Sequence, residues 1–200
     1  MTGLAEAQSY LSASRALLMA AGGPGARMAE DLPEAPSGED QPPISQPVAR
    51  VMGELADLAW PPARALMAAL AQDDRLTWRQ TYRAEDFGPD FLQNYGWVEF
   101  LGPFGPCPSS THRLALLVLG PGTHYPEHSH GPEEVYLVLA GEMRWTRGTH
   151  PPERAPGGAL LHHPPHLPHA METDAHPVAM LGLWQGGNLA AKSDIPRSSR

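Results

Sequence analysis

The sequence predicts a mainly β protein, an antiparallel sandwich or barrel, preceded by an α-helical N-terminal part. Two observations carry this prediction. After Gly105, short apolar or alternating runs follow one another, separated by glycine and proline, as is typical of short strands. Before residue 72, apolar residues recur at three- and four-residue spacing, as on helices. A chain of 200 residues is long enough for one domain with a sizeable appendage and a real core.

The helical part is expected to hold several helices. Residues 3–21 are rich in alanine and carry an amphipathic leucine pattern. Residues 22–48 are dense in glycine, proline and acidic residues, a composition that predicts a linker or a loop held by its neighbours. From residue 48 to 72 the pattern predicts two helices split near Pro61-Pro62. We therefore assign residues 1–96 to a helical N-terminal part that contains the linker.

An aromatic-rich segment, residues 76–104, leads into the β part. Aromatic side chains usually fill a core, but this density next to a barrel could also wall a pocket. Beyond it, predicted strands cover residues 113–119, 134–139, 142–147, 159–162 and 177–184. Short strands at this spacing indicate a sandwich or barrel. We place the barrel at residues 97–190 and a polar tail at 191–200.

Composition narrows the class of protein. The formal net charge of -8 argues against nucleic-acid binding, which normally needs a basic patch. Cys107 is the only cysteine, so no internal disulfide is expected, and the N-terminus lacks the basic region of a secretion signal. No apolar run is long enough to span a membrane. These features predict a cytoplasmic protein that binds neither nucleic acid nor membrane.

Four polar groups lie within nine residues of each other between Gly122 and Gly141: His128, His130, Glu134 and Tyr136. Side chains alternate faces along a strand, so the two histidines share one face, and Glu134 shares a face with Tyr136 beyond the Gly131-Pro132 turn. Two strands meeting at that turn could aim all four groups at one point. Imidazole and carboxylate suit one divalent transition metal: zinc, iron, manganese, nickel or cobalt.

A second histidine-rich segment, residues 158–173, contains Gly158, Pro164 and His169. Together the two segments resemble the paired motifs of the cupin family, although His166 and Thr173 stand where that family usually has glycine and asparagine. The resemblance implies a cupin (double-stranded β-helix, jelly-roll) barrel. It also implies these metal ligands: His128, His130, Glu134 and His169.

Two tyrosines are candidate bases. Tyr136 is expected on the Glu134 face, and Tyr125 lies three residues before His128. A phenol with a pKa of about 10 is a poor base at neutral pH. A nearby cation stabilises phenolate, so Tyr136 could become a base or a metal ligand.

The tyrosines make the resemblance to the cupin family more specific. The chain from about Leu117 to Gly187, and the segment 81–97 before it, resemble the cupin-type dimethylsulfoniopropionate (DMSP) lyases, the DddQ-like group. The residues that carry this likeness are Tyr125, His128, His130, Glu134, Tyr136, His169 and Trp184. The likeness implies cleavage of DMSP to acrylate and dimethyl sulfide by α-proton abstraction and β-elimination, with Tyr136 or Tyr125 as base. A sulfonium over an aromatic face gains about 2 kcal/mol. The candidate substrate-binding residues are Trp184, Tyr82, Trp78 and Tyr95.

Other functions remain open from the sequence. They are a related cupin enzyme acting on another small carboxylate, a cupin dioxygenase, and a cupin that only binds a ligand. The expected partner is a small-molecule substrate, and the cupin resemblance also allows a homodimer. Four further histidines are either orienting residues or rim residues: His124, His162, His163 and His166.

Overall fold

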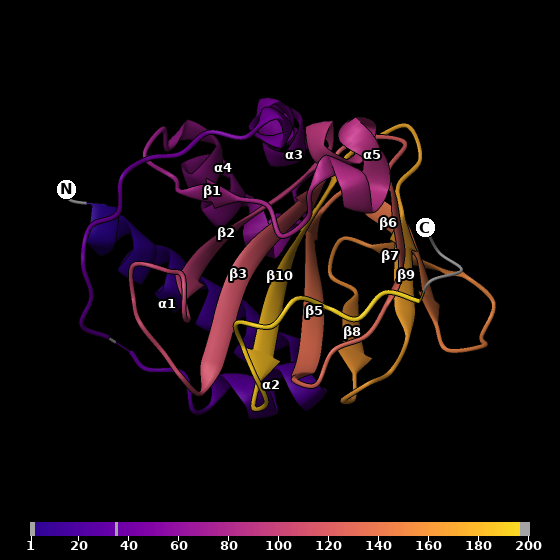
Figure 1. The fold of residues 1–200 in the computed structure, drawn as a ribbon. Coiled ribbons are helices and arrows are strands. Elements are labelled where there is room, and N and C mark those ends of the chain that lie inside the picture. The colour runs from indigo at the N-terminus through magenta and orange to yellow at the C-terminus, as the bar shows by residue number, and fades with distance from the viewer. Residues whose placement is uncertain (1–2, 35, 197–200) are drawn as a thin grey trace.

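A computed structural model describes residues 3–34 and 36–196. Two antiparallel sheets lie beside a group of helices (Figure 1). The larger sheet has the strand order β1-β2-β3-β10-β5-β8, and the smaller has the order β4-β9-β6-β7. The strands are β1 (Trp78–Arg79), β2 (Tyr95–Leu101), β3 (His112–Leu119), β4 (His124–His128), β5 (Glu133–Ala140), β6 (Glu142–Arg147), β7 (Glu153–Pro156), β8 (Leu160–His163), β9 (His169–Glu172) and β10 (Val178–Gln185). The expected strands at β3, β5, β6, β8 and β10 are confirmed within one residue.

The helices precede most of the strands. They are α1 (Gly3–Ala21), α2 (Gly23–Ala29), α3 (Met52–Asp57), α4 (Arg64–Gln72) and α5 (Ala84–Gln93), with 3-10 turns at Pro47–Val51 and Pro61–Ala63. The expected helix over residues 3–21 is confirmed as α1. The expected split near Pro61-Pro62 is also confirmed, because the second 3-10 turn separates α3 from α4.

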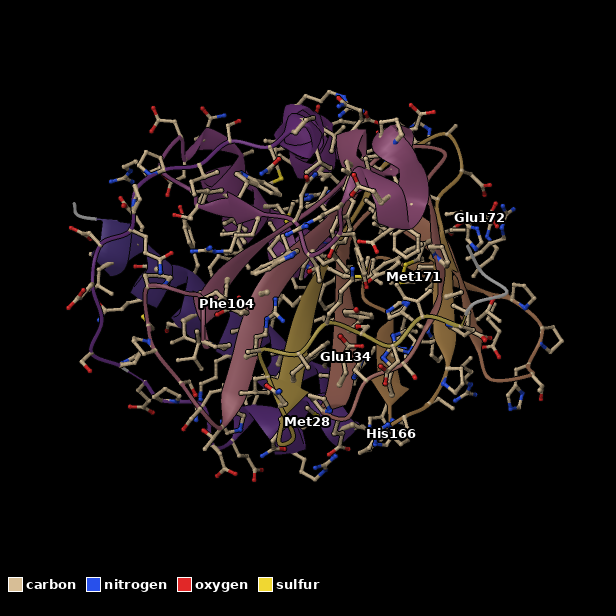
Figure 2. All side chains as sticks on the ribbon, in the orientation of Figure 1. Met28, Phe104, Glu134, His166, Met171 and Glu172 are labelled. Atoms are coloured by element: carbon tan, nitrogen blue, oxygen red, sulfur yellow. The ribbon has the colours of Figure 1, made fainter. Side chains whose placement is uncertain are left out.

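Alternation along the central strands produces two cores. On β5, Val135 and Leu137 face the helices, whereas Tyr136 and Val138 face the smaller sheet. The same alternation runs along β3 and β10. The larger sheet is therefore covered on one face by helices and on the other by the smaller sheet, and Glu134 lies between the two sheets (Figure 2).

The N-terminal part is more ordered than its composition predicts. Part of the expected linker forms α2, whose Met28 and Ala29 are completely buried in the helix-side core. Gly25 lies close to Leu160 of β8, since a Cβ there would be 3.1 Å from its Cδ1. The composition of 22–48 is poor in apolar residues, but the sheet supplies the surface against which these few are buried.

The larger sheet includes residues that precede the segment assigned to the barrel. β2 starts at Tyr95, and β1 pairs with it through Trp78 and Val98. In the expected polar tail, the backbone of Asp194 exchanges two hydrogen bonds with Ser129, at 2.8 and 3.0 Å. This C-terminal segment crosses in front of the larger sheet (Figure 1). Residues 197–200 of that predicted tail lie outside the described residues. Among the described helices, none is long and apolar enough to cross a bilayer.

Candidate metal centre

Three buried histidines present the same ring nitrogen to the space between the sheets. Nδ1 of His128, His130 and His169 lies 2.8 to 2.9 Å from the backbone carbonyl of Pro126, Pro132 and Leu167, respectively. A carbonyl only accepts, so each Nδ1 carries a hydrogen, and in the neutral imidazole Nε2 then keeps a lone pair. This is the tautomer in which a histidine binds a metal through Nε2.

These lone pairs converge on Glu134. Its Oε2 lies 3.0 Å from Nε2 of His130 and 3.5 Å from Nε2 of His169. The ligand atoms of the three residues all lie within 4.8 Å of one another, and Nε2 of His169 is buried without a hydrogen-bond partner. A nitrogen lone pair that faces a carboxylate oxygen is satisfied by a proton or by a metal cation. Burial opposes the charge on His130, but Glu134 raises the pKa of this imidazole, which favours a proton on Nε2 where no metal is bound. The donor set therefore fits a divalent cation, as the sequence predicts for these three residues.

The other two predicted ligands lie beside this group. The ring centroid of His128 is 4.2 Å from that of His169 and 6.4 Å from that of His130. Burial lowers the pKa of His128 to about 4, so its imidazole is neutral at pH 7. Tyr136 shares the inward face of β5 with Glu134, and both side chains line the same cavity.

Glu134 is flanked by one residue from each neighbouring strand. It pairs in register with Trp184 of β10 and with His163 of β8. The indole N–H of Trp184 donates to Oε1, and Nδ1 of His163 lies 3.1 Å from Oε2. Burial opposes the charge on Glu134, but His130 and His163 hold the pKa of this carboxyl well below its ordinary value. The carboxylate is therefore ionised at neutral pH.

His163 is one of the four histidines for which the sequence left open an orienting role or a place at the rim. It is fully buried, whereas His162 is partly exposed and pairs with Glu133 at 2.7 Å. The alternation of β8 was the available signal, because Leu161 and His163 share the inward face. His166, in contrast, lies at the exposed lower edge of the molecule in Figure 2.

The two candidate bases lie in a cluster of tyrosines. The hydroxyls of Tyr125 and Tyr82 are 2.7 Å apart, and the Tyr125 ring stacks on His128 at 4.1 Å between centroids. Burial raises the pKa of Tyr125 and of Tyr136 well above the ordinary value of 10. Both phenols are protonated in the absence of a nearby cation.

A cavity of about 520 Å³, counting its open mouth, adjoins this cluster. Tyr82, Tyr95 and Trp184, three of the four aromatic residues predicted to bind substrate, line its wall. Trp78 does not, because it pairs with Val98 on the helix-facing side of the sheet and is buried in that core. Trp97, one position away in register, occupies the cavity wall instead.

Two of these aromatic faces already contact other groups. The Trp184 ring stacks on His130 at 4.2 Å, and the guanidinium of Arg113 lies 5.3 Å from its centroid. Arg113 also lies 4.3 Å over Trp97 and pairs with Glu99 at 2.7 Å. The Arg113 charge in the cavity wall is therefore balanced by a buried carboxylate.

Comparison with known proteins points to one family. Residues 24–180 match the family model described as dimethylsulfoniopropionate lyase. The chain is 32% identical over 156 residues to dimethylsulfoniopropionate lyase DddQ of Ruegeria pomeroyi, and the match covers 78% of each chain.

Solved structures agree over nearly the whole chain. The crystal structure of DMSP lyase DddQ from Ruegeria pomeroyi superposes with a TM-score of 0.84 at 30% identity, covering 95% of this chain and 96% of that one. A chain from the crystal structures of the DMSP lyases RdDddP and RnDddQII gives a TM-score of 0.83 at 30% identity, covering 97% and 100%. The expected cupin fold with a helical N-terminal part is confirmed.

Proposed function

Because this chain belongs to the dimethylsulfoniopropionate lyase family, we propose that the cavity between its two sheets cleaves DMSP to acrylate and dimethyl sulfide. The chain is thus a carbon–sulfur lyase with a cupin fold. The grouping of the donor atoms of His130, Glu134 and His169 within 4.8 Å of one another, beside a cavity lined by Tyr125 and Tyr136, carries the proposal.

We propose that one divalent transition metal, of the zinc, iron, manganese, nickel or cobalt group, binds at this centre. His130, Glu134 and His169 are the first three ligands, since their donor atoms already lie together. His128 is the fourth, because it is buried beside His169 in the same tautomer. Tyr136, which lines the cavity beside Glu134, is the remaining candidate ligand.

The substrate would be held by its two charged ends. DMSP carries a carboxylate at one end and a sulfonium at the other. The carboxylate belongs at the histidine centre, where a divalent cation held by these residues would offset its charge and that of Glu134. The sulfonium then lies against the aromatic wall formed by Tyr82, Tyr95 and Trp184, where a cation gains about 2 kcal/mol.

A tyrosine between the histidine centre and the aromatic wall is in position to abstract the proton. Tyr136 lines the cavity next to Glu134, and we propose that its phenolate takes the α-proton, with Tyr125 as the second candidate. A divalent cation at the site supplies the positive charge that favours phenolate and offsets the charge formed beside the carboxylate.

The elimination balances without an acid at the sulfur. The electron pair of the broken C–H bond forms the carbon–carbon double bond of acrylate. The electron pair of the C–S bond leaves with sulfur, which departs as neutral dimethyl sulfide. No residue needs to protonate the leaving group, which fits an aromatic wall at that end of the cavity.

The direct test measures dimethyl sulfide in the gas above purified, metal-loaded protein supplied with DMSP. We expect release by the wild type, and we expect at least a hundredfold less from Tyr136→Phe and from a chelator-treated sample, since acid–base catalysis contributes 10²–10⁴-fold. Tyr10→Phe is the matched control, because Tyr10 lies against Asp73, outside the cavity.

The outcomes separate the alternatives. If the metal-loaded wild type releases no dimethyl sulfide at millimolar DMSP, DMSP is not the substrate and another small carboxylate is favoured. Full activity of Tyr136→Phe with loss in Tyr125→Phe would assign the base to Tyr125. Dependence of the reaction on oxygen would indicate a dioxygenase, since elimination consumes none.

We also propose that the protein acts as a homodimer in the cytoplasm. The buried free thiol of Cys107 is compatible with a reducing compartment. Sedimentation of the metal-loaded chain tests the dimer, and a monomer at assay concentration would contradict it.

A further inference from the structure

We infer that His163 is a positioning residue for Glu134, held by Trp145 in the one tautomer that can donate to this carboxylate. The inference rests on the proposed metal centre and concerns a histidine that is not one of its ligands. Its basis is a chain of contacts from Trp145 on β6, through His163 on β8, to Glu134 on β5.

The first contact determines the tautomer. The indole N–H of Trp145 lies 2.8 Å from Nε2 of His163. An indole nitrogen can only donate, so Nε2 must accept and carries no hydrogen. In a neutral imidazole the single hydrogen then lies on Nδ1. Trp145 therefore fixes the side of the His163 ring from which a proton can be donated.

That side faces Glu134. Nδ1 of His163 is buried, lacks a well-aligned hydrogen-bond partner, and lies 3.1 Å from Oε2 of Glu134. A buried N–H without an acceptor is costly, and apo geometry of such groups is commonly loose. The carboxylate is the acceptor within reach, so His163 donates to Oε2 as Trp184 donates to Oε1.

The tautomer also excludes His163 from the ligand set. His128, His130 and His169 each donate from Nδ1 to a backbone carbonyl, which makes Nε2 the nitrogen that can bind a metal. In His163 the nitrogen nearest the centre carries the hydrogen, and the other accepts from Trp145. A nitrogen that carries a hydrogen offers no lone pair to a metal.

Packing holds the ring in this orientation. The His163 side chain is completely buried and stacks on His169 at 3.9 Å with an interplanar angle of 24°. Its other ring neighbours are Tyr136 at 5.2 Å and Trp145 at 5.3 Å, both edge-on. His163 therefore contacts a predicted ligand, a candidate base and Glu134, and any rotation of its ring would disturb all three.

The test uses two amide substitutions, each of which keeps one hydrogen bond of the His163 ring and removes the other, and one substitution that removes both. In His163→Asn the amide N–H occupies the position of Nδ1 and can still donate to Glu134. In His163→Gln the longer side chain places the amide near Nε2, where it meets Trp145 and not Glu134. His163→Leu removes both hydrogen bonds while filling the space.

Three quantities are measured on each full-length variant: zinc affinity by chelator competition, the visible spectrum of the cobalt-loaded protein, and kcat and KM for DMSP. We expect zinc affinity or kcat to fall 10- to 100-fold in the Gln and Leu variants, with KM little changed and with rescue by Asn to within a few-fold. We expect the cobalt spectra to keep the same coordination number.

A second measurement needs no substitution at position 163. Long-range ¹H–¹⁵N spectra of the zinc-loaded wild type are expected to show His163 protonated at Nδ1 and unprotonated at Nε2. In Trp145→Phe, which keeps an aromatic ring and removes the indole N–H, the ¹⁵N signal of Nε2 should shift because this nitrogen loses its donor, while Glu134 still accepts from Nδ1–H.

Several results would overturn the inference. They are equal losses in the Asn and Gln variants, no loss in any variant, a change of cobalt coordination number in His163→Leu, or an Nε2-protonated His163 in the wild type. The metal-affinity and NMR measurements do not use DMSP. If the wild type releases no dimethyl sulfide but the Asn and Gln variants still differ in zinc affinity, the substrate is wrong and the role of His163 stands.

Discussion

Trp184 has two contacts with the centre that can be separated by substitution. Its indole N–H donates to Oε1 of Glu134, and its ring stacks on His130 at 4.2 Å. The first is a hydrogen bond to a charged group, worth about 2 kcal/mol, and the second is packing. A phenyl ring keeps most of the packing and loses the donor.

We therefore predict that Trp184→Phe lowers kcat/KM about tenfold or more, since 1.4 kcal/mol corresponds to a factor of ten. The bound zinc per chain should stay near the wild-type value, because the ligands are untouched. Steady-state kinetics and metal analysis check this. Trp60→Phe is the control, since the Trp60 side chain packs over Gly157 and Gly158 at the helix-covered side. Equal activity of both variants would show that the donor to Glu134 is dispensable.

At the scale of the strand, β10 is shaped to fit the Tyr136 ring. Gly182 pairs in register with Tyr136, and a Cβ at this glycine would be 3.0 Å from Cε1 of the ring. That distance is tighter than ordinary van der Waals contact. The absence of a side chain on β10 thus lets the tyrosine lie flat across the strand and point into the cavity.

Gly182→Ala is predicted to push the Tyr136 ring by a few tenths of an ångström and to lower kcat about tenfold, since displacement of 1 Å can cost about 10²-fold. KM should change less, because the other cavity walls remain. Gly53→Ala is the matched control, because nothing lies within 4 Å of a Cβ at this helical glycine. Steady-state kinetics of the two variants measure both effects. An unchanged kcat in Gly182→Ala would show that the Tyr136 ring does not need a glycine at position 182.

β4 shows how an irregular strand brings two site residues together. Tyr125 and His128 are three residues apart, so a regular strand would place them on opposite faces. The register between β4 and β9 shifts between them, and both side chains are buried and stacked. This bulge places the second candidate base beside a predicted ligand.

At the scale of the whole molecule, Asp73 connects the N-terminal helix to the rest of the chain. The hydroxyl of Tyr10 on α1 donates to it at 2.9 Å, and Arg75 donates through its backbone and its side chain. Burial alone would raise the pKa of Asp73, but these hydrogen bonds outweigh it and lower the pKa below 3.8.

Stability should follow this shift with a definite sign. A carboxyl whose folded pKa is depressed stabilises the fold above its unfolded pKa of about 3.9, and the contribution is lost as pH falls through the folded value. We predict that Asp73→Asn lowers the free energy of unfolding by about 2 kcal/mol at pH 7. The difference from the wild type should shrink below pH 4.

Urea unfolding at pH 7 and at pH 3 measures both values. Asp57→Asn is the control, because Asp57 is exposed on α3, and it should match the wild type at both pH values. A difference between Asp73→Asn and the wild type that stays constant over this range would mean that the charge of Asp73 does not contribute to stability.

Much of the site follows from the sequence alone. The alternation of His128, His130, Glu134 and Tyr136 predicted a metal centre and a face shared by Glu134 and Tyr136, and the cupin resemblance added His169. These features could be predicted because side-chain periodicity within a strand is a local property. The helices at α1, α3 and α4 could be predicted for the same reason.

Only the tertiary structure decided which residues from other strands complete the site. Register across β10, β5 and β8 places Trp184 and His163 on either side of Glu134, and register between β1 and β2 sends Trp78 to the helix-side core while Trp97 faces the cavity. The order of α2 likewise depends on the sheet that buries it. Strand register and burial depend on contacts between residues far apart in the chain, so no local pattern of the sequence encodes them.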